Sequence, residues 1–236
     1  MATNRQIASH LRDLLTPRSL GLASRSWVLS RLDDAVGELL EDKSTSEAGT
    51  RRVSLVAHSA GGWLARAWLA RFPPWAAAGR RGCQYVRTLV TLGSPHHPPV
   101  PGGGGGGGGP PDPTGGALNW VDTNFPGAFY AGVGVKYVCV AGQAVVGAAG
   151  EASRGEKRSL AAYAATSYAT VSGRSGDGVV GDGVVPLEWA QLDGAKQIIL
   201  PGAFHSMSAP GTFDDPAVYP WYGSAAAIDA WAGELV

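Results

Sequence analysis

The feature that most restricts the fold of this chain is a short apolar segment that runs, through a single serine, directly into a helix. Residues 53–57 read Val-Ser-Leu-Val-Ala, and residues 58–62 read His-Ser-Ala-Gly-Gly. A nearly continuous apolar run is typical of a strand that helices cover on both faces of a parallel sheet. Residues 63–71 predict a helix, which Pro73 and Pro74 end. A strand, a tight turn and a helix in immediate succession indicate an α/β fold.

Further apolar strands alternate with helices along the chain. We expect strands at residues 85–92, 136–141 and 197–200, each followed by a glycine or by Pro-Gly. An amphipathic helix is expected at residues 27–43, and a further helix is expected at residues 225–235. This alternation predicts a mostly parallel sheet with helices on both faces.

The length of 236 residues predicts a single domain, which we place at residues 27–236. Residues 96–117 are rich in proline and glycine and include eight consecutive glycines, so a disordered loop is expected there within the domain. Residues 1–26 form an N-terminal extension that is expected to be poorly ordered. They carry more Arg and Ser than acidic residues, which resembles an organellar transit peptide but also fits a surface helix.

Composition excludes several classes of function. Nineteen basic residues balance nineteen acidic ones, which argues against nucleic acid or an anionic membrane surface as the main partner. No apolar run approaches the roughly 20 residues that span a bilayer. Cys83 and Cys139 cannot form a disulfide framework and indicate an intracellular protein, in the cytoplasm or the chloroplast. The histidines are scattered without paired Cys/His spacing, so neither a metal nor another cofactor is expected.

Ser59 is the candidate nucleophile. Residues 57–61, Ala-His-Ser-Ala-Gly, follow the nucleophile-elbow pattern with alanine in place of the first glycine. The pattern needs small residues because strand and helix approach closely at the turn. The backbone N–H of Ala60 is then a candidate donor to the oxyanion. The alternative is a tight turn with an incidental serine.

A serine nucleophile requires a histidine base and an acid, which in this fold follow the serine with the acid first. The downstream histidines are His96, His97 and His205. The first two enter the Pro/Gly loop, where we expect no base to be held in position. His205 follows the last apolar strand, where a parallel sheet carries its functional residues, and it is the candidate base.

Asp182 is the favoured acid, within Gly181–Pro186 and next to a rigid Val-Val-Pro run. Asp177 is the rival, because a local duplication gives it nearly the same surroundings. The remaining candidates lie in polar turns or after the histidine: Asp193, Asp214 and Asp215.

Several motifs carry a family resemblance. In chain order they are Val56–Arg66, Thr91–His96, Lys136–Gly142, Gly181–Pro186, the final histidine and Trp221–Gly223. Over roughly residues 27–235, apart from the glycine-rich insertion, the chain resembles the plant and algal lipase-like α/β-hydrolases, which are distantly related to the GPI inositol-deacylase group. The resemblance implies a Ser–Asp–His triad that acts on a carboxylic ester, plausibly a lipid. It also selects Asp182 over Asp177.

The chain departs from this family at two places. Alanine stands at position 57, and only a helix precedes the strand at 53–57, where the family has several strands. One of those strands ends in the loop that supplies a second oxyanion N–H. We therefore expect an N-terminally truncated α/β-hydrolase fold with an exposed edge at residues 53–57 and with reduced activity.

The leading functional hypothesis is a serine ester hydrolase that works through an acyl-enzyme on a small-molecule or lipid ester. A lipid substrate would bring peripheral contact with a membrane, and the oligomeric state stays open. The alternatives are an impaired remnant that acts as a binding or scaffold protein, and an acyltransferase. Residues 118–130 and 143–165 are candidates for a cap. Six aromatic residues are candidates for an acyl pocket or for ordinary packing: Trp63, Trp68, Trp120, Phe125, Phe129 and Tyr130.

Overall fold

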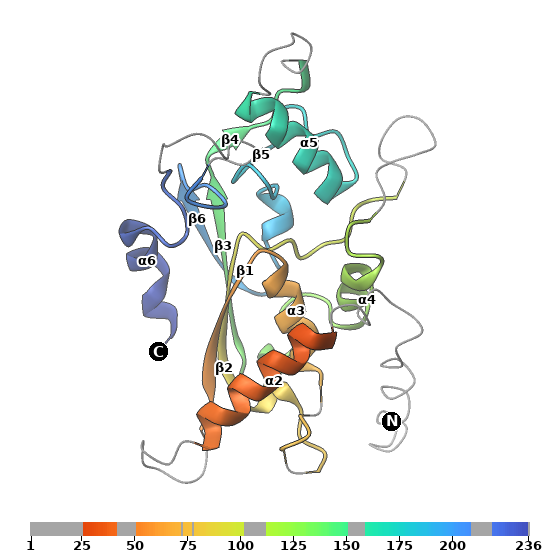
Figure 1. Ribbon diagram of the computed structural model, residues 1–236, viewed down its shortest axis with the longest axis vertical. Coiled ribbons are helices and arrows are strands. Elements are labelled where there is room, and N and C mark those ends of the chain that lie inside the picture. Colours follow the sequence, from red (N-terminus) through yellow and green to blue (C-terminus); the bar gives the residue numbers. More distant parts are fainter. Residues whose placement is uncertain are drawn as a thin grey trace.

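The computed structural model describes residues 26–41, 51–71, 73–76, 78–101, 112–150, 159–208 and 219–235. Nearly all of the expected N-terminal extension, the run of glycines, and both Asp214 and Asp215 lie outside these residues. Within them the chain forms a four-stranded sheet with helices on either side (Figure 1).

The sheet is parallel throughout and has the strand order β1-β2-β3-β6. Its strands are β1 (Val53–His58), β2 (Val86–Leu92), β3 (Lys136–Gln143) and β6 (Lys196–Pro201). All four were expected from the apolar runs in the sequence. Because the strands are parallel, their carboxyl ends meet at one edge, where open α/β sheets carry their sites.

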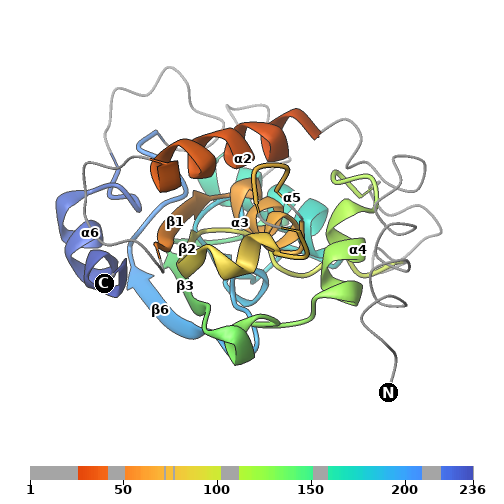
Figure 2. The same cartoon turned by 90° about the horizontal axis from the view of Figure 1, so that it is seen from below.

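One face of the sheet is covered by α2 (Ser26–Glu41), α3 (Ala60–Leu69) and α4 (Ala117–Asn124). Figure 2 shows α2 lying outside α3, so that α3 is enclosed between α2 and the sheet. Trp63 and Trp68 of α3 are fully buried in this layer. The indole N–H of Trp68 donates to the carboxylate of Asp33, which ties α3 to α2.

The opposite face is covered by α6 (Ala225–Trp231) and the 3-10 helix η6 (Ala232–Leu235). Val90 of β2 and Val138 of β3 point to this side and pack in one cluster with Trp231. Their neighbours in the strands, such as Leu89, belong to the other face, as the two-residue period of a strand requires. The predicted α/β fold with a mostly parallel sheet and helices on both faces is confirmed.

A smaller unit lies beyond the carboxyl ends of the strands (Figure 1). The strands β4 (Val145–Val146) and β5 (Val180–Gly181) pair antiparallel, and α5 (Leu160–Ser172) packs against β4. Three short 3-10 helices complete the described elements: η2 (Gly82–Gln84), η3 (Ala131–Val133) and η5 (Glu188–Ala190). The sequence pattern predicted neither β4 nor β5, because strands of two residues have no measurable period.

β1 lies at the edge of the sheet, and in the described part of the chain no strand pairs with its outer side. Val53 and Ser59 donate their N–H groups toward β2, to the carbonyls of Tyr85 and Leu92. The backbone groups of the alternate residues therefore point away from β2. Val56, at the middle of the strand, is 46% exposed. The edge expected at residues 53–57 is thus present in the described sheet.

Both ends of the segment at residues 96–117, where a disordered loop is expected, make specific contacts in the structure. His96 is fully buried, and the Val100 N–H donates to the Ser172 carbonyl at 2.7 Å. At the other end, Asp112 accepts N–H groups from the turn that leads into α4. Residues 102–111, which hold the glycine run, lie outside the described residues.

Candidate active site

Ser59 occupies the sharp turn between β1 and α3. Its φ of 54° and ψ of −130° make it the one non-glycine residue with positive φ in the described part of the chain. Such a conformation costs on the order of 1–3 kcal/mol and persists only where the surrounding structure enforces it. The Ser59 N–H donates to Leu92 O at 3.0 Å, and its carbonyl accepts from Gly62 N at 3.1 Å. The turn is held on both sides, as expected of a nucleophile elbow.

Small residues around the serine allow α3 to lie close to the sheet. A Cβ at Gly62 would lie 2.5 Å from the Cβ of Ser94, which follows β2, and 3.0 Å from Cγ2 of Thr91, so a larger residue there would require α3 or β2 to shift. A Cβ at Gly61 would lie 3.7 Å from the Cβ of Ala57, which is an ordinary contact. Alanine at position 57, where the pattern usually has glycine, is therefore accommodated opposite Gly61.

The structure brings together Asp182, which follows β5, and His205, which follows β6. His205 Nδ1 lies 2.8 Å from Asp182 Oδ2, and the His205 N–H donates to the Asp182 carbonyl at 2.9 Å. Asp182 is 1% exposed and His205 is 8% exposed. Asp177 lies in an exposed turn and accepts the Ala149 N–H instead. Of the two rival aspartates, Asp182 is the one that contacts the histidine.

Four donors surround the Asp182 carboxylate. Oδ1 accepts the backbone N–H groups of Val184 and Val185, at 2.9 and 2.7 Å. Oδ2 accepts the Tyr222 hydroxyl at 2.8 Å in addition to His205 Nδ1. With two partners on each oxygen, the carboxylate cannot rotate without losing hydrogen bonds. The histidine tautomer that carries its proton on Nδ1 is thereby favoured.

Two glycines at the ends of central strands leave room for this carboxylate. A Cβ on Gly93 would lie 2.6 Å from Asp182 Oδ2, and Gly93 has a positive φ of 52°. A Cβ on Gly142 would lie 2.9 Å from the Cβ of Asp182. In the sequence, both glycines come where apolar strands end. Their role could not be predicted there, because the carboxylate that they accommodate lies 40 or more positions away in the chain.

His58 joins the serine turn to the loop of the histidine. Its ring centroid lies 4.5 Å from that of His205, and its Nε2 lies 2.9 Å from the His205 carbonyl oxygen. Because a carbonyl only accepts, Nε2 of His58 is the protonated nitrogen. Burial, and secondarily the charge of His205, lowers the pKa of His58. A neutral His58 thus links the residue before Ser59 to His205.

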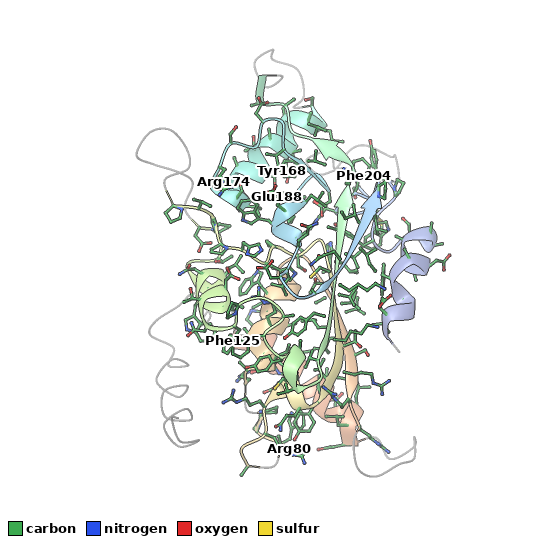
Figure 3. All side chains as sticks on the ribbon, turned by 180° about the vertical axis from the view of Figure 1, so that it is seen from behind. Arg80, Phe125, Tyr168, Arg174, Glu188 and Phe204 are labelled. Atoms are coloured by element: carbon green, nitrogen blue, oxygen red, sulfur yellow. The ribbon has the colours of Figure 1, made fainter. Side chains whose placement is uncertain are left out.

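α5 supports the loop that carries the acid. The Tyr168 hydroxyl accepts the Gly183 N–H at 2.8 Å and donates to the Val145 carbonyl at 3.0 Å. Phe204, the residue before His205, packs in the same apolar cluster as Tyr168 (Figure 3). The loop that carries Asp182 and the loop that carries His205 are therefore both supported by the cluster around Tyr168. Sequence patterns did not reveal this contact.

The expected mechanism also requires an N–H donor to the oxyanion and a hydrogen bond between Ser59 and His205. Ala60 is the first residue of α3, where backbone N–H groups have no acceptor within the helix. Its N–H is thus available to an oxyanion. Among the described residues, no hydrogen bond joins Ser59 Oγ to His205. Catalytic hydrogen bonds are often long in structures without substrate and shorten on binding.

His96 contacts α3 and the strands β2 and β3, whereas His97 contacts α4. His96 Nε2 lies 3.0 Å from Thr91 Oγ1, and its carbonyl accepts from Arg66. Burial, together with the nearby Arg66 charge, holds the pKa of His96 well below its usual value. His97 pairs with Asp122 at 3.5 Å, and this hydrogen bond raises the pKa of His97. The sequence argument against both as bases assumed a flexible loop, but His96 is fully buried and held by Thr91 and Arg66.

The aromatic candidates for an acyl pocket belong mainly to the core. Trp63, Trp68, Trp120, Phe125 and Tyr130 are buried in the cluster between the helices and the sheet. Phe129, next to them, is 48% exposed. Among the residues that the structure describes, no group of three or more His, Cys, Asp or Glu side chains is arranged to hold a metal ion.

Comparison with known families gives one match. Residues 28–102 match the model of a family described as the PGAP1-like alpha/beta domain. This range runs from α2 past β2 and includes the serine turn, so the match supports a hydrolase-type α/β fold. A search of curated proteins finds no match. No helix in the described ranges is long and apolar enough to cross a membrane.

Proposed function

We propose that the protein is a serine hydrolase that cleaves a carboxylic ester through an acyl-enzyme. In this proposal Ser59 is the nucleophile, His205 is the general base and Asp182 orients the histidine. The observation that carries it is the buried Asp182–His205 pair, which lies at the same edge of the sheet as the strained serine turn. A strained serine and an oriented histidine are the two elements that an activated hydroxyl requires.

The reaction follows from these positions. His205 Nε2 takes the proton of Ser59 Oγ as the oxygen attacks the ester carbonyl, and the Ala60 N–H donates to the oxyanion that forms. When the ester C–O bond breaks, the imidazolium returns the proton to the leaving alcohol. A water molecule then gives a proton to His205 and attacks the carbonyl of the acyl-enzyme. As the acid is released, the imidazolium returns this proton to Ser59 Oγ, which restores the free serine.

For the substrate we propose a lipid ester. The support is the resemblance of the serine, acid and histidine motifs to lipase-like hydrolases, together with the PGAP1-like match over residues 28–102. Hydrolysis of p-nitrophenyl esters of increasing acyl length tests this part by itself. A preference for long chains is expected, and a strict preference for acetate would contradict it.

A fluorophosphonate probe tests the nucleophile. We expect mass spectrometry to locate one adduct on Ser59, and we expect the adduct to disappear in His205→Ala. His97→Ala is the matched control, because this half-buried histidine has an aspartate partner but lies outside the site. An adduct that persists in His205→Ala, or the absence of an adduct on folded protein, would contradict the mechanism.

Further measurements would distinguish ester hydrolysis from two other functions, ester binding without turnover and acyl transfer to an alcohol. Ester binding without turnover on folded protein would identify a binding or scaffold protein that retains the triad residues. If the serine reacts but water is a poor acceptor, added alcohols would receive the acyl group, and product analysis would identify an acyltransferase.

A further inference from the structure

Tyr222 is a fully buried residue between the acid of the proposed triad and the central strand β3. It lies just before α6, in the Trp-Tyr-Gly segment at residues 221–223. Its hydroxyl donates to Asp182 Oδ2 at 2.8 Å and accepts the Gly142 N–H at 2.7 Å. The phenol thus connects the carboxylate to the backbone of the sheet.

The position of this bond distinguishes Tyr222 from an ordinary core tyrosine. Oδ2 is the same carboxylate oxygen that faces His205 Nδ1. A donor on that oxygen withdraws part of its negative charge, whereas the two N–H groups of Val184 and Val185 bind the other oxygen. Burial, and then the charge of Asp182, raises the pKa of Tyr222 well above its usual value, so the phenol keeps its proton and remains a donor.

We propose that Tyr222 is a positioning residue of the triad, which fixes the Asp182 carboxylate and tunes the charge that Asp182 presents to His205. This inference rests on the proposed function. Tyr222 touches neither Ser59 nor a substrate atom in the proposed reaction, and it acts only through Asp182.

The space around the phenol supports this role. A Cβ on Gly93 would lie 2.7 Å from the Tyr222 hydroxyl oxygen, and a Cβ on Gly142 would lie 3.0 Å from it. The glycines at the ends of β2 and β3 therefore leave the space in which the Tyr222 hydroxyl reaches the carboxylate. A tyrosine that served packing alone would not need its oxygen to be accommodated at two strand ends.

The effect on His205 has a defined sign. The titratable groups that face its ring are Asp182, His58 and Tyr222. Without the phenol donor, Oδ2 presents more negative charge to the His205 Nδ1–H and attracts it more strongly. The hydrogen bond from His205 Nδ1 to Asp182 Oδ2 is therefore expected to strengthen in Tyr222→Phe, while the carboxylate loses one restraint.

The test follows the proton on His205 Nδ1 by NMR and measures fluorophosphonate labelling in parallel. In Tyr222→Phe we expect the resonance of this proton to move downfield and the labelling rate to fall by about tenfold. Tyr168→Phe is the matched control, because it removes another buried hydroxyl that bonds the acid loop without touching the carboxylate. In this control we expect the resonance to stay in place.

An unchanged Nδ1–H resonance in folded Tyr222→Phe would overturn the inference, even if labelling or thermal stability fell. If the variant does not fold, 3-fluorotyrosine at position 222 takes its place. Its stronger donor is expected to move the resonance upfield, and an unchanged resonance would again overturn the inference. Labelling of the wild-type chain decides the proposed function separately, because the NMR measurement needs no turnover.

Discussion

Gly93 closely approaches the carboxylate of Asp182: a Cβ on residue 93 would lie 2.6 Å from Asp182 Oδ2. Gly93 follows β2 and Asp182 follows β5, so the acid of the proposed triad depends on the absence of a side chain just after another strand. The positive φ of 52° adds a second requirement for glycine at this position.

Gly93→Ala is expected to displace the carboxylate and to destabilise the fold. The backbone conformation alone costs about 1–2 kcal/mol for alanine, and the clash adds to this cost. Gly178→Ala is the matched control, since Gly178 also has positive φ but has no neighbour within 4 Å of its added Cβ. We expect thermal melts to show a larger loss for Gly93→Ala, and Ser59 labelling to fail in that variant alone. Equal effects of the two substitutions would contradict the proposed contact.

The serine turn offers a matched pair of glycines. Gly62→Ala would place a Cβ 2.5 Å from the Cβ of Ser94, whereas Gly61→Ala makes only an ordinary contact with Ala57 at 3.7 Å. In a helix, alanine is favoured over glycine by about 1 kcal/mol. We therefore expect Gly61→Ala to be neutral or stabilising and Gly62→Ala to be strongly destabilising, as measured by urea unfolding. A stable Gly62→Ala variant would show that α3 can move away from β2.

The two rival aspartates can be compared by the same substitution. Asp182→Asn replaces the acceptor of the His205 Nδ1–H and is expected to lower the rate of Ser59 labelling by about 10³–10⁴. Asp177→Asn changes a residue whose carboxylate accepts only the Ala149 N–H in an exposed turn. Labelling of that variant is expected to match the wild type. Loss of labelling in Asp177→Asn, with Asp182→Asn unaffected, would reassign the acid.

The buried His96 predicts a pH dependence of stability. Its pKa in the folded state lies well below the ordinary value of 6.5, chiefly because of burial. As the pH falls below 6.5, the unfolded chain binds a proton there that the folded chain does not. This residue then lowers the free energy of unfolding by up to about 1.4 kcal/mol per pH unit.

Chemical denaturation between pH 7 and pH 5 checks this expectation against His96→Asn. The variant is expected to be less stable at pH 7, because it loses the contact of His96 with Thr91. Its stability should then fall less steeply with pH than that of the wild type. Parallel pH curves for the two proteins would mean that His96 is not neutral in the folded state.

Much of the fold could be predicted from sequence because it depends on local periodicity. The four parallel strands and the helices α2, α3 and α6 correspond to apolar runs and helical patterns whose boundaries moved by only a few residues in the structure, whereas α4 and α5 were not expected as helices. The serine turn could also be predicted, since its requirements lie in consecutive small residues. His205 followed from its place after the last strand of the sheet. These features are local because strands, helices and tight turns are specified by neighbouring residues.

Other parts of the site depend on the packing of distant segments. Asp177 and Asp182 share the local sequence Asp-Gly-Val-Val, so residues alone left both open, and the structure places only Asp182 beside His205. The contact of Tyr222 with the carboxylate joins residues 40 positions apart. The burial of His96 at the start of a Pro/Gly-rich segment was likewise not visible from its neighbours.

The sequence by itself therefore determined the four parallel strands, the helices α2, α3 and α6, and the candidate serine and histidine, because each is specified by residues close to it in the chain. It favoured Asp182 as the acid, but only the tertiary structure decided that the Asp182 carboxylate contacts His205 and which side chains hold that carboxylate. The physical reason is that a hydrogen bond of 2.8 Å between distant loops depends on the register and spacing of the strands that carry them. Composition and hydrophobic periodicity do not specify that spacing.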